Sequence, residues 1–113
     1  MSVTIYHNPR CSKSRTTLAL LQERGIQPVV IDYLKTPPTA AEIRRLLHLL
    51  KLAPEALIRK NEAEYKAIAD LNLDADGLIA AMAKFPKLIE RPIVVANNRA
   101  AIGRPPENVL EII

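Results

Sequence analysis

The sequence predicts a small α/β domain with a mixed sheet covered by helices, built in the order βαβ, helical insert, ββα. Three observations predict this class. Two short β-favouring segments flank a helical segment near the N-terminus, which is the pattern of a parallel, right-handed βαβ unit. A long stretch with helical periodicity follows. Two more β-favouring segments, joined by an Asn-Asn pair, then precede a C-terminal helical segment.

The length of 113 residues suits one compact domain. The hydrophobic fraction of 49% is sufficient for a core, and the charged fraction of 25% is ordinary for a protein surface. We therefore expect a single domain over residues 1–113, with a helical insertion at about residues 39–87. No large apolar stripe is left over once the elements are assigned, which favours a monomer.

The first three elements are expected near the N-terminus. Val3–Tyr6 is short and β-favouring, which indicates a buried strand. Asn8-Pro9 ends this strand, and a helix is predicted over residues 12–24, with Gly25 at the position typical of a C-terminal glycine. A second strand is predicted at Val29–Ile31. The apolar face of the helix is expected to include Leu18, Ala19 and Leu21.

The middle of the chain is predicted to be helical. Thr39–Glu42 reads as a capping box that opens a helix ending near Leu50. One face of this helix carries Ile43, Leu46, Leu47 and Leu50. Pro86 ends the helical region. Shorter helices are expected at residues 54–58, 62–69 and 74–84.

The last three elements are expected close to the C-terminus. Ile93–Ala96 is predicted to be the third strand, and Asn97-Asn98 is typical of a tight hairpin turn. A fourth strand is predicted at about residues 100–102. Pro105-Pro106 then opens a closing helix. The apolar face of that helix is expected to include Val109, Leu110 and Ile113.

The surface is predicted to be basic, because the net charge is +4 and the pI is near 9.5. Such a surface suits nucleic acid, an anionic substrate or nothing specific. Aromatic residues make up only 4% of the chain and tryptophan is absent, so few side chains could stack on nucleic-acid bases. We therefore expect a small anion as the ligand and no nucleic-acid partner.

The chain shows no signal for export or membrane insertion. No basic segment leads into an apolar run at the N-terminus. No apolar stretch approaches the ~18 residues that a membrane span needs. We expect a cytoplasmic protein without a membrane partner. No cluster of metal-ligating residues suggests a metal site.

The strongest single feature is the segment His7–Arg15, which lies between the first predicted strand and the first predicted helix. It contains Cys11. An ordinary thiol has a pKa of about 8.5 and is mostly protonated at neutral pH, whereas the thiolate is the nucleophile. Amides at a helix N-terminus favour an anion there, whether a thiolate or a bound oxyanion. Neighbouring cations would lower the pKa further, and hydroxyls could donate to the anion. These groups are His7, Arg10, Lys13 and Arg15, with the hydroxyls of Ser12 and Ser14.

Two other interpretations of these residues stay open. Free cysteines are commonly buried core residues, so Cys11 could be structural; its basic neighbours Arg10 and Lys13 favour a reactive thiol. His7, at a strand end, could simply face solvent. Because Cys11 is the single cysteine, the chain cannot form an internal disulfide, and any redox cycle needs a thiol from outside.

Five segments together resemble the glutaredoxin-coupled arsenate reductase family. They are HNP-x-C-xx-SR at the N-terminus, YLKTPPT, LIRKNE, RPIVV and a late GRP, and they run through the chain in order with compatible spacing. The resemblance implies a thioredoxin-like fold with a helical insertion. It implies arsenate or a similar oxyanion as the substrate, glutathione as the external reductant, glutaredoxin as a partner and no bound cofactor.

By the same resemblance, three arginines correspond to the anion-handling arginines of the family. Arg59 is expected to act in catalysis, and Arg91 and Arg104 to bind the substrate. Guanidinium groups suit this task because they stay charged and match oxyanions in a bidentate geometry. The resemblance also implies that the Arg91-Pro92 peptide bond is cis and that the Pro92 backbone lines the substrate site. Ser12, Ser14 and Arg15 are further candidates for substrate contacts, and His7 for catalysis.

The resemblance implies a covalent mechanism. The Cys11 thiolate attacks pentavalent arsenic, glutathione attacks next, the arsenic is reduced to the trivalent state, and glutaredoxin removes the remaining glutathione from a mixed disulfide.

Two alternatives are left open. An Spx-type regulator that binds RNA polymerase would share the fold, but such redox-responsive relatives typically carry a C-xx-C switch, and this chain has Cys11-Ser12-Lys13-Ser14. A thiol-dependent reductase or glutathione-binding protein of the same family could act on another substrate. Ser12-Lys13 replaces the Gly-Thr pair common in arsenate reductases, and the chain lacks the C-terminal extension that many of them carry.

Overall fold

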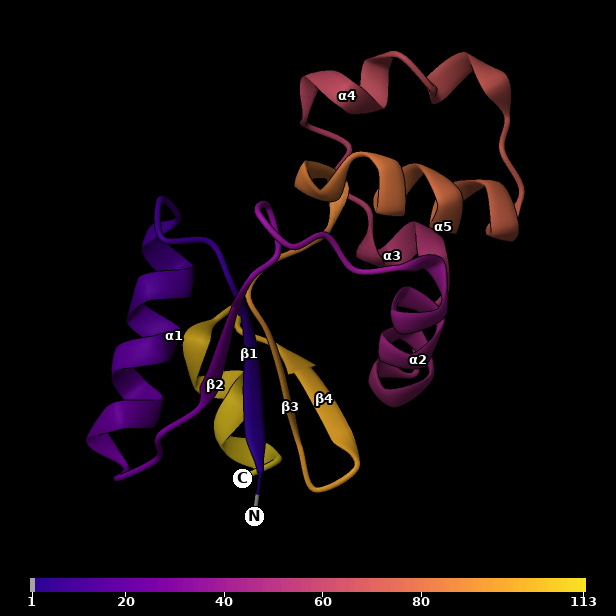
Figure 1. Ribbon diagram of the computed structural model, residues 1–113. Coiled ribbons are helices and arrows are strands. Elements are labelled where there is room, and N and C mark those ends of the chain that lie inside the picture. The colour runs from indigo at the N-terminus through magenta and orange to yellow at the C-terminus, as the bar shows by residue number, and fades with distance from the viewer. Residues whose placement is uncertain (1) are drawn as a thin grey trace. The chain divides into compact units, whose positions relative to one another are not determined.

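The computed structural model describes residues 2–113, which form two compact units. The first unit runs to Thr36 and resumes at Arg91 for the rest of the chain, and the second spans Pro37–Glu90. The first unit contains a four-stranded sheet, and the named elements of the second unit are all helical (Figure 1).

The sheet of the first unit is mixed, as the sequence predicts. Its strand order is β2-β1-β3-β4. Strand β1 (Val3–His7) runs parallel to β2 (Val29–Asp32) and antiparallel to β3 (Ile93–Ala96). Strand β4 (Arg99–Ile102) completes the sheet beside β3 and starts one residue before the predicted segment. The two central strands β1 and β3 carry the buried residues, whereas Val29 on edge strand β2 is 57% exposed.

One face of this sheet is covered by α1 (Ser12–Glu23) and the 3₁₀ helix η3 (Pro106–Glu111), which also contact each other (Figure 1). The register pairs Val3 with Ala96 and Ile5 with Val94, so these four side chains point to the same face. Together with residues from the two helices they form one buried cluster. The members of that cluster are Val3, Ile5, Leu21, Val94, Ala96, Val109 and Ile112.

The predicted helix at residues 12–24 is confirmed, but its buried face differs from the prediction. Leu21 is buried, Leu18 is partly buried, and Ala19 is exposed. The other buried side chains are the polar residues Ser14 and Thr17. The Thr17 hydroxyl donates to the carbonyl oxygen of Lys13 at 2.8 Å, so it needs no partner outside the helix. The apolar pattern alone therefore predicted this face only in part.

The hairpin turn has the predicted conformation, whereas the final helix differs in type from the prediction. Asn97 and Asn98 have φ of 55° and 59°, the left-handed conformation that a type I′ turn requires at both positions. The closing helix is confirmed, but it is a 3₁₀ helix rather than the α-helix typical of this position. Val109 in this helix and Ile112 directly after it are buried, and Ile112 was absent from the predicted apolar face.

The second unit consists of short helices around an apolar core. Helix α2 (Ala40–Leu50) starts with the predicted capping box. It is followed by α3 (Pro54–Leu57), α4 (Ala63–Lys66), η1 (Ala69–Leu71), α5 (Ala75–Lys84) and η2 (Pro86–Leu88). The stretch predicted as one helix at residues 62–69 is thus divided between α4 and η1. Helices α2 and α3 both contact α5. The fully buried residues here include Ile43, Leu46, Leu57, Met82 and Leu88.

Over residues 2–113, none of the helices has the length and apolar character required to cross a membrane.

Candidate active site

Cys11 lies at the N-terminus of α1, directly after a tight turn that follows β1. The Cys11 amide donates to the Asn8 carbonyl oxygen at 3.0 Å, and the Arg10 amide donates to the Asn8 side-chain oxygen at 3.0 Å. The Cys11 carbonyl oxygen accepts from the Arg15 amide at 3.0 Å, which starts the helix. Cys11 occupies the N-cap position in an extended conformation, and it is partly exposed. The turn therefore presents the sulfur where the free amides of the helix converge.

A buried hydrogen-bond network holds this turn in place. The Ser14 hydroxyl oxygen lies 2.6 Å from His7 Nδ1 and accepts from the Asn8 amide at 3.0 Å. Ser14 is fully buried, and His7 and Asn8 are each 7% exposed. The network connects the last residue of β1 with the first turn of α1. It fixes the backbone on both sides of Cys11.

His7 does not supply the positive charge that the sequence suggests. Burial lowers its pKa, and this effect exceeds the opposing influence of Asp32; Arg15 lowers the pKa further. An imidazole with a pKa below its usual value of about 6.5 is neutral at pH 7. His7 therefore acts in this site as a hydrogen-bond partner of Ser14, and it is buried rather than solvent-facing.

The Cys11 thiol has a lowered pKa, although burial alone would raise it. The backbone N–H of Ser14, the side chain of Arg91 and the backbone N–H of Lys13 together outweigh the burial. Both backbone groups belong to the first turn of α1, where amides have no helical partner. A thiol with a lowered pKa is deprotonated more readily near neutral pH, so Cys11 has the electrostatic surroundings of a nucleophilic cysteine.

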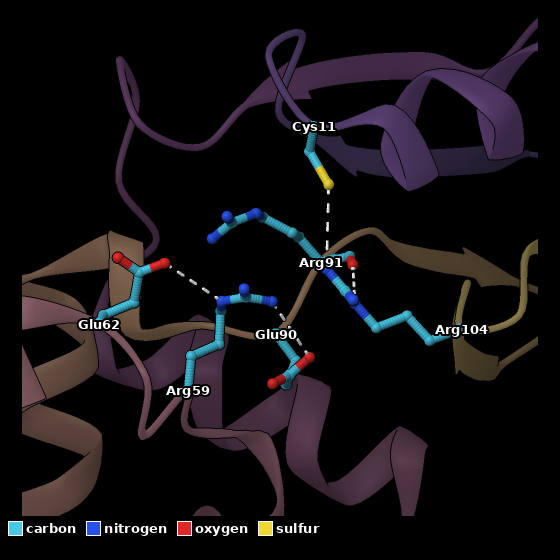
Figure 2. Close-up of polar contacts among 6 residues, drawn as sticks. All are labelled: Cys11, Arg59, Glu62, Glu90, Arg91 and Arg104. Carbon is cyan, nitrogen blue, oxygen red and sulfur yellow. Dashed lines mark hydrogen bonds and ion pairs between the residues drawn. The ribbon is translucent and has the colours of Figure 1, made fainter.

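Arg104 and Arg91 come from the other end of the sequence and meet at Cys11. Arg104 Nη2 lies 3.9 Å from the Cys11 sulfur, and Arg104 Nε donates to the Arg91 carbonyl oxygen at 2.8 Å (Figure 2). The Arg91-Pro92 bond is cis, as the resemblance implies. Arg104-Pro105 is also cis, which was not predicted. Two guanidinium groups thus lie beside a partly exposed sulfur, an arrangement that suits a small oxyanion.

Four further residues named from the sequence lie close to these groups: Ser12, Lys13 and Arg15 at the start of α1, and Pro92 directly after Arg91. Arg15 donates from its guanidinium to the Pro9 carbonyl oxygen at 2.9 Å, so one of its donors supports the turn. Ser12 and Lys13 are exposed at the start of α1, and their side chains are accessible to a ligand. Pro92 is buried, and its carbonyl oxygen accepts from the Gly103 amide at 2.9 Å.

Arg59 belongs to the second unit, where two carboxylates hold it. Its Nε lies 3.4 Å from a Glu62 carboxylate oxygen, and its Nη1 lies 3.5 Å from a Glu90 carboxylate oxygen (Figure 2). The Arg59 side chain is 17% exposed. Its backbone amide donates to the Leu88 carbonyl oxygen at 2.6 Å. The guanidinium is therefore fixed within its own unit by these carboxylates.

Tyr33 is a residue of the site that the sequence did not single out. It follows β2 directly and is 1% exposed. Burial raises its pKa, while the charge of Arg91 lowers it again and Cys11 raises it. Its electrostatic partners are thus the same groups that define the site around the sulfur. Two signals were available: Tyr33 opens the YLKTPPT segment, and it follows a strand that runs parallel to β1, where the carboxyl ends of parallel strands share one edge of a sheet.

Over residues 2–113, no group of three or more histidine, cysteine, aspartate or glutamate side chains is placed to hold a metal ion. The chemistry that the described residues offer is nucleophilic: a thiol with a lowered pKa, two guanidinium groups and the amides of a helix N-terminus.

Comparison with known proteins gives consistent matches over the whole chain. A family model described as the ArsC family matches residues 6–112. The solved structure of an arsenate reductase from Vibrio cholerae is 57% identical, with a TM-score of 0.95, and covers 100% of this chain and 98% of that one. An uncharacterized protein of Escherichia coli, YfgD, is 56% identical over 98% of this chain and 96% of its own length. An arsenate reductase of Neisseria meningitidis is 46% identical over 98% and 97% of the two chains.

Proposed function

This chain belongs to the ArsC family and has its thioredoxin-like fold, and on that premise we propose that it reduces arsenate to arsenite with Cys11 as the nucleophile. The observation that supports this proposal best is the setting of the sulfur. It is partly exposed, has a lowered pKa, and lies 3.9 Å from one guanidinium while a second one helps to lower its pKa. Its relatives include proteins named arsenate reductase.

The proposed reaction starts with attack of the Cys11 thiolate on pentavalent arsenic. An arsenic–sulfur bond forms, and one arsenate oxygen leaves as water after it has taken up protons. Glutathione then attacks the Cys11 sulfur of this adduct. A disulfide forms between Cys11 and glutathione, the arsenic–sulfur bond breaks, and its electron pair stays on arsenic as arsenite leaves. The two sulfurs are oxidised, and arsenic gains two electrons.

An external protein thiol has to restore the enzyme. In the proposed cycle a glutaredoxin thiolate attacks the glutathione sulfur of the mixed disulfide and releases the Cys11 thiolate. The chain holds a single cysteine, so it cannot resolve this disulfide itself. We propose that no bound cofactor takes part, because glutathione supplies the reducing equivalents.

The residues of the chain have distinct roles in this proposal. Arg91 and Arg104 bind arsenate oxygens and stabilise the charge that develops on them during attack. The amides of Lys13 and Ser14 stabilise the thiolate. We assign to Arg59 the role that the family resemblance implies, stabilisation of the reduced arsenic intermediate.

Other residues shape the site. His7 and Ser14 keep the turn rigid through their 2.6 Å contact. Ser12 and Arg15 supply further hydrogen-bond donors near Cys11, and the backbone at Pro92 lines the site.

A coupled assay tests the proposal. Arsenate-dependent NADPH oxidation would be followed through glutathione reductase, glutathione and glutaredoxin. We expect wild type to be active, Cys11→Ser to fall to background, and Arg91→Ala to raise the KM for arsenate about ten-fold, the effect of losing a charge-assisted contact. Arg24→Ala is the matched control, because Arg24 is exposed at the end of α1.

Two outcomes would contradict the proposal. Activity that survives Cys11→Ser would rule out this nucleophile. An inactive wild type, with all coupling components verified on a known arsenate reductase, would reject arsenate as the substrate and favour another oxyanion or thiol substrate at the same site.

A further inference from the structure

Tyr33 lies at the edge of the sheet where the Cys11 turn begins. In the register of the parallel strands, His7 is opposite Asp32, so the next residue of each strand, Asn8 and Tyr33, leaves the sheet at the same edge. Asn8 starts the turn that presents Cys11. Tyr33 is therefore placed by the sheet itself, beside the element that carries the nucleophile.

The Tyr33 hydroxyl is buried, and its polar neighbours are the side chains of Arg91 and Asn8, both of which act on the phenol as hydrogen-bonding groups. A buried hydroxyl is stable only with a polar partner, whereas phenylalanine would fill the same space without that requirement. The hydroxyl thus calls for an explanation other than packing.

We propose that Tyr33 is a positioning residue, whose hydroxyl oxygen orients the Arg91 guanidinium beside the Cys11 sulfur and toward an oxyanion bound there. A phenol has an ordinary pKa of about 10 and is uncharged at neutral pH, and burial raises the pKa of Tyr33 further. A neutral oxygen can accept from one edge of a guanidinium while the full positive charge stays available to the thiolate and the oxyanion.

Arg59 shows the contrast within its own unit. Two carboxylates, those of Glu62 and Glu90, lie within 3.4 Å and 3.5 Å of its guanidinium nitrogens and compensate its charge. A carboxylate in the place of Tyr33 would compensate the charge of Arg91 in the same way, and it would repel both the Cys11 thiolate and an incoming anion. A phenol avoids both effects.

The test uses Tyr33→Phe, which removes only the hydroxyl. The rate of Cys11 alkylation by iodoacetamide would be measured against pH to give the apparent pKa of the thiol. We expect that pKa to rise, so that alkylation at pH 6.5 slows at least about three-fold, corresponding to half a pKa unit. Tyr65→Phe is the matched control, because Tyr65 lies in α4 of the second unit.

A second measurement shows whether Tyr33 acts through Arg91. In an Arg91→Ala background we expect Tyr33→Phe to leave the alkylation profile unchanged, because its target is gone. An equal shift in both backgrounds would overturn the proposal. So would a Tyr33→Phe profile that matches wild type. A Tyr33→Phe protein that fails to fold would also overturn it, because the hydroxyl would then be structural.

The inference rests on the proposed function only for the identity of the oxyanion. With arsenate we expect Tyr33→Phe to raise KM more than it lowers kcat. The alkylation profile needs no arsenate. A wild type that is inactive toward arsenate would therefore contradict the proposed function, while a shifted profile in Tyr33→Phe would still support the positioning role.

Discussion

At the scale of single residues, the charges that act on the sulfur are not those closest to it in sequence. Arg10 and Lys13 are neighbours of Cys11, but both are exposed. Lys13 contributes its backbone N–H, and the charged side chain that lowers the pKa of Cys11 belongs to Arg91. Arg104, at 3.9 Å from the sulfur, is 93 positions away in the sequence. The electrostatics of the thiol thus depend on the tertiary fold.

The buried histidine makes the stability of the fold depend on pH. Because the pKa of His7 is lower in the folded protein, the unfolded chain binds more protons once the pH falls below about 6.5. The contribution of His7 to stability is therefore present above that pH and is lost as the pH falls toward the folded-state pKa. We expect the free energy of unfolding in urea to decrease from pH 7 to pH 5 more in wild type than in His7→Asn.

His48→Asn is the matched control for this experiment, because His48 is exposed on α2. We expect it to keep the pH dependence of wild type. Equal pH dependence of His7→Asn and wild type would contradict the assignment of a lowered pKa to His7.

The predictability of the site also differs from residue to residue. The position of Cys11 between a strand and a helix could be predicted, because a strand, a turn and a helix are local features of the sequence. The neutral state of His7 could not, since it depends on burial. Tyr33 was missed because its importance comes from a buried hydroxyl near two groups that are distant in sequence.

At the scale of elements, the residues that mark the end of a helix or a strand predicted the structure better than the apolar patterns did. Three such features were predicted, because each depends on the local conformational preference of one or two residues. They are the Thr39–Glu42 capping box, the helix end at Gly25, where φ is 75°, and the Asn97-Asn98 turn. The buried face of α1 was predicted in part only. A threonine that bonds to its own helix can be buried as readily as an apolar residue.

The capping box of α2 permits a quantitative test. The Thr39 hydroxyl oxygen accepts from the Glu42 amide at 3.1 Å, so Thr39→Ala leaves that amide without its cap. We expect the free energy of unfolding to decrease by about 1 kcal/mol, measured by urea denaturation. Thr16→Ala, at an exposed position inside α1, is the comparison and should be neutral or slightly stabilising. Equal effects of the two substitutions would show that the cap contributes nothing.

At the scale of the whole molecule, the thiol site is assembled from both ends of the chain within the first unit. The order of elements predicted the mixed sheet, because βαβ connectivity and a hairpin restrict the possible topologies. The sequence alone could not give the contact between Arg104 and Cys11, which depends on how β1 and β3 lie side by side. The family resemblance, rather than the spacing of residues, pointed to Arg91 and Arg104.

Gly103 packs against both α1 and Pro92, so a substitution there tests whether this packing affects the thiol site. A Cβ at this position would lie 2.5 Å from the Thr17 hydroxyl oxygen in α1 and 2.9 Å from Pro92 Cγ. We expect Gly103→Ala to lower the free energy of unfolding by about 1–3 kcal/mol through overpacking. Because Pro92 adjoins Arg91, we also expect the alkylation rate of Cys11 to change.

Gly25→Ala is the control that separates a loss of stability from a change in the alkylation rate of Cys11. A Cβ at Gly25 would meet no atom within 4 Å, and its φ of 75° strains any other residue, so we expect a loss of about 1 kcal/mol with an unchanged alkylation rate. A Gly103→Ala protein as stable as wild type would contradict the close packing at this position.

The N-cap position of Cys11 also gives α1 a means to respond to the chemistry of the sulfur. Among the described residues, α1 has no acidic side chain in its first turn, so a thiolate is the anion that complements the positive end of its dipole there. In the mixed disulfide of the proposed cycle, that negative charge is gone. We expect the first turn of α1 to fray more readily in that form, so the proposed intermediate that awaits an incoming thiol is also the one whose backbone opens most easily around the sulfur.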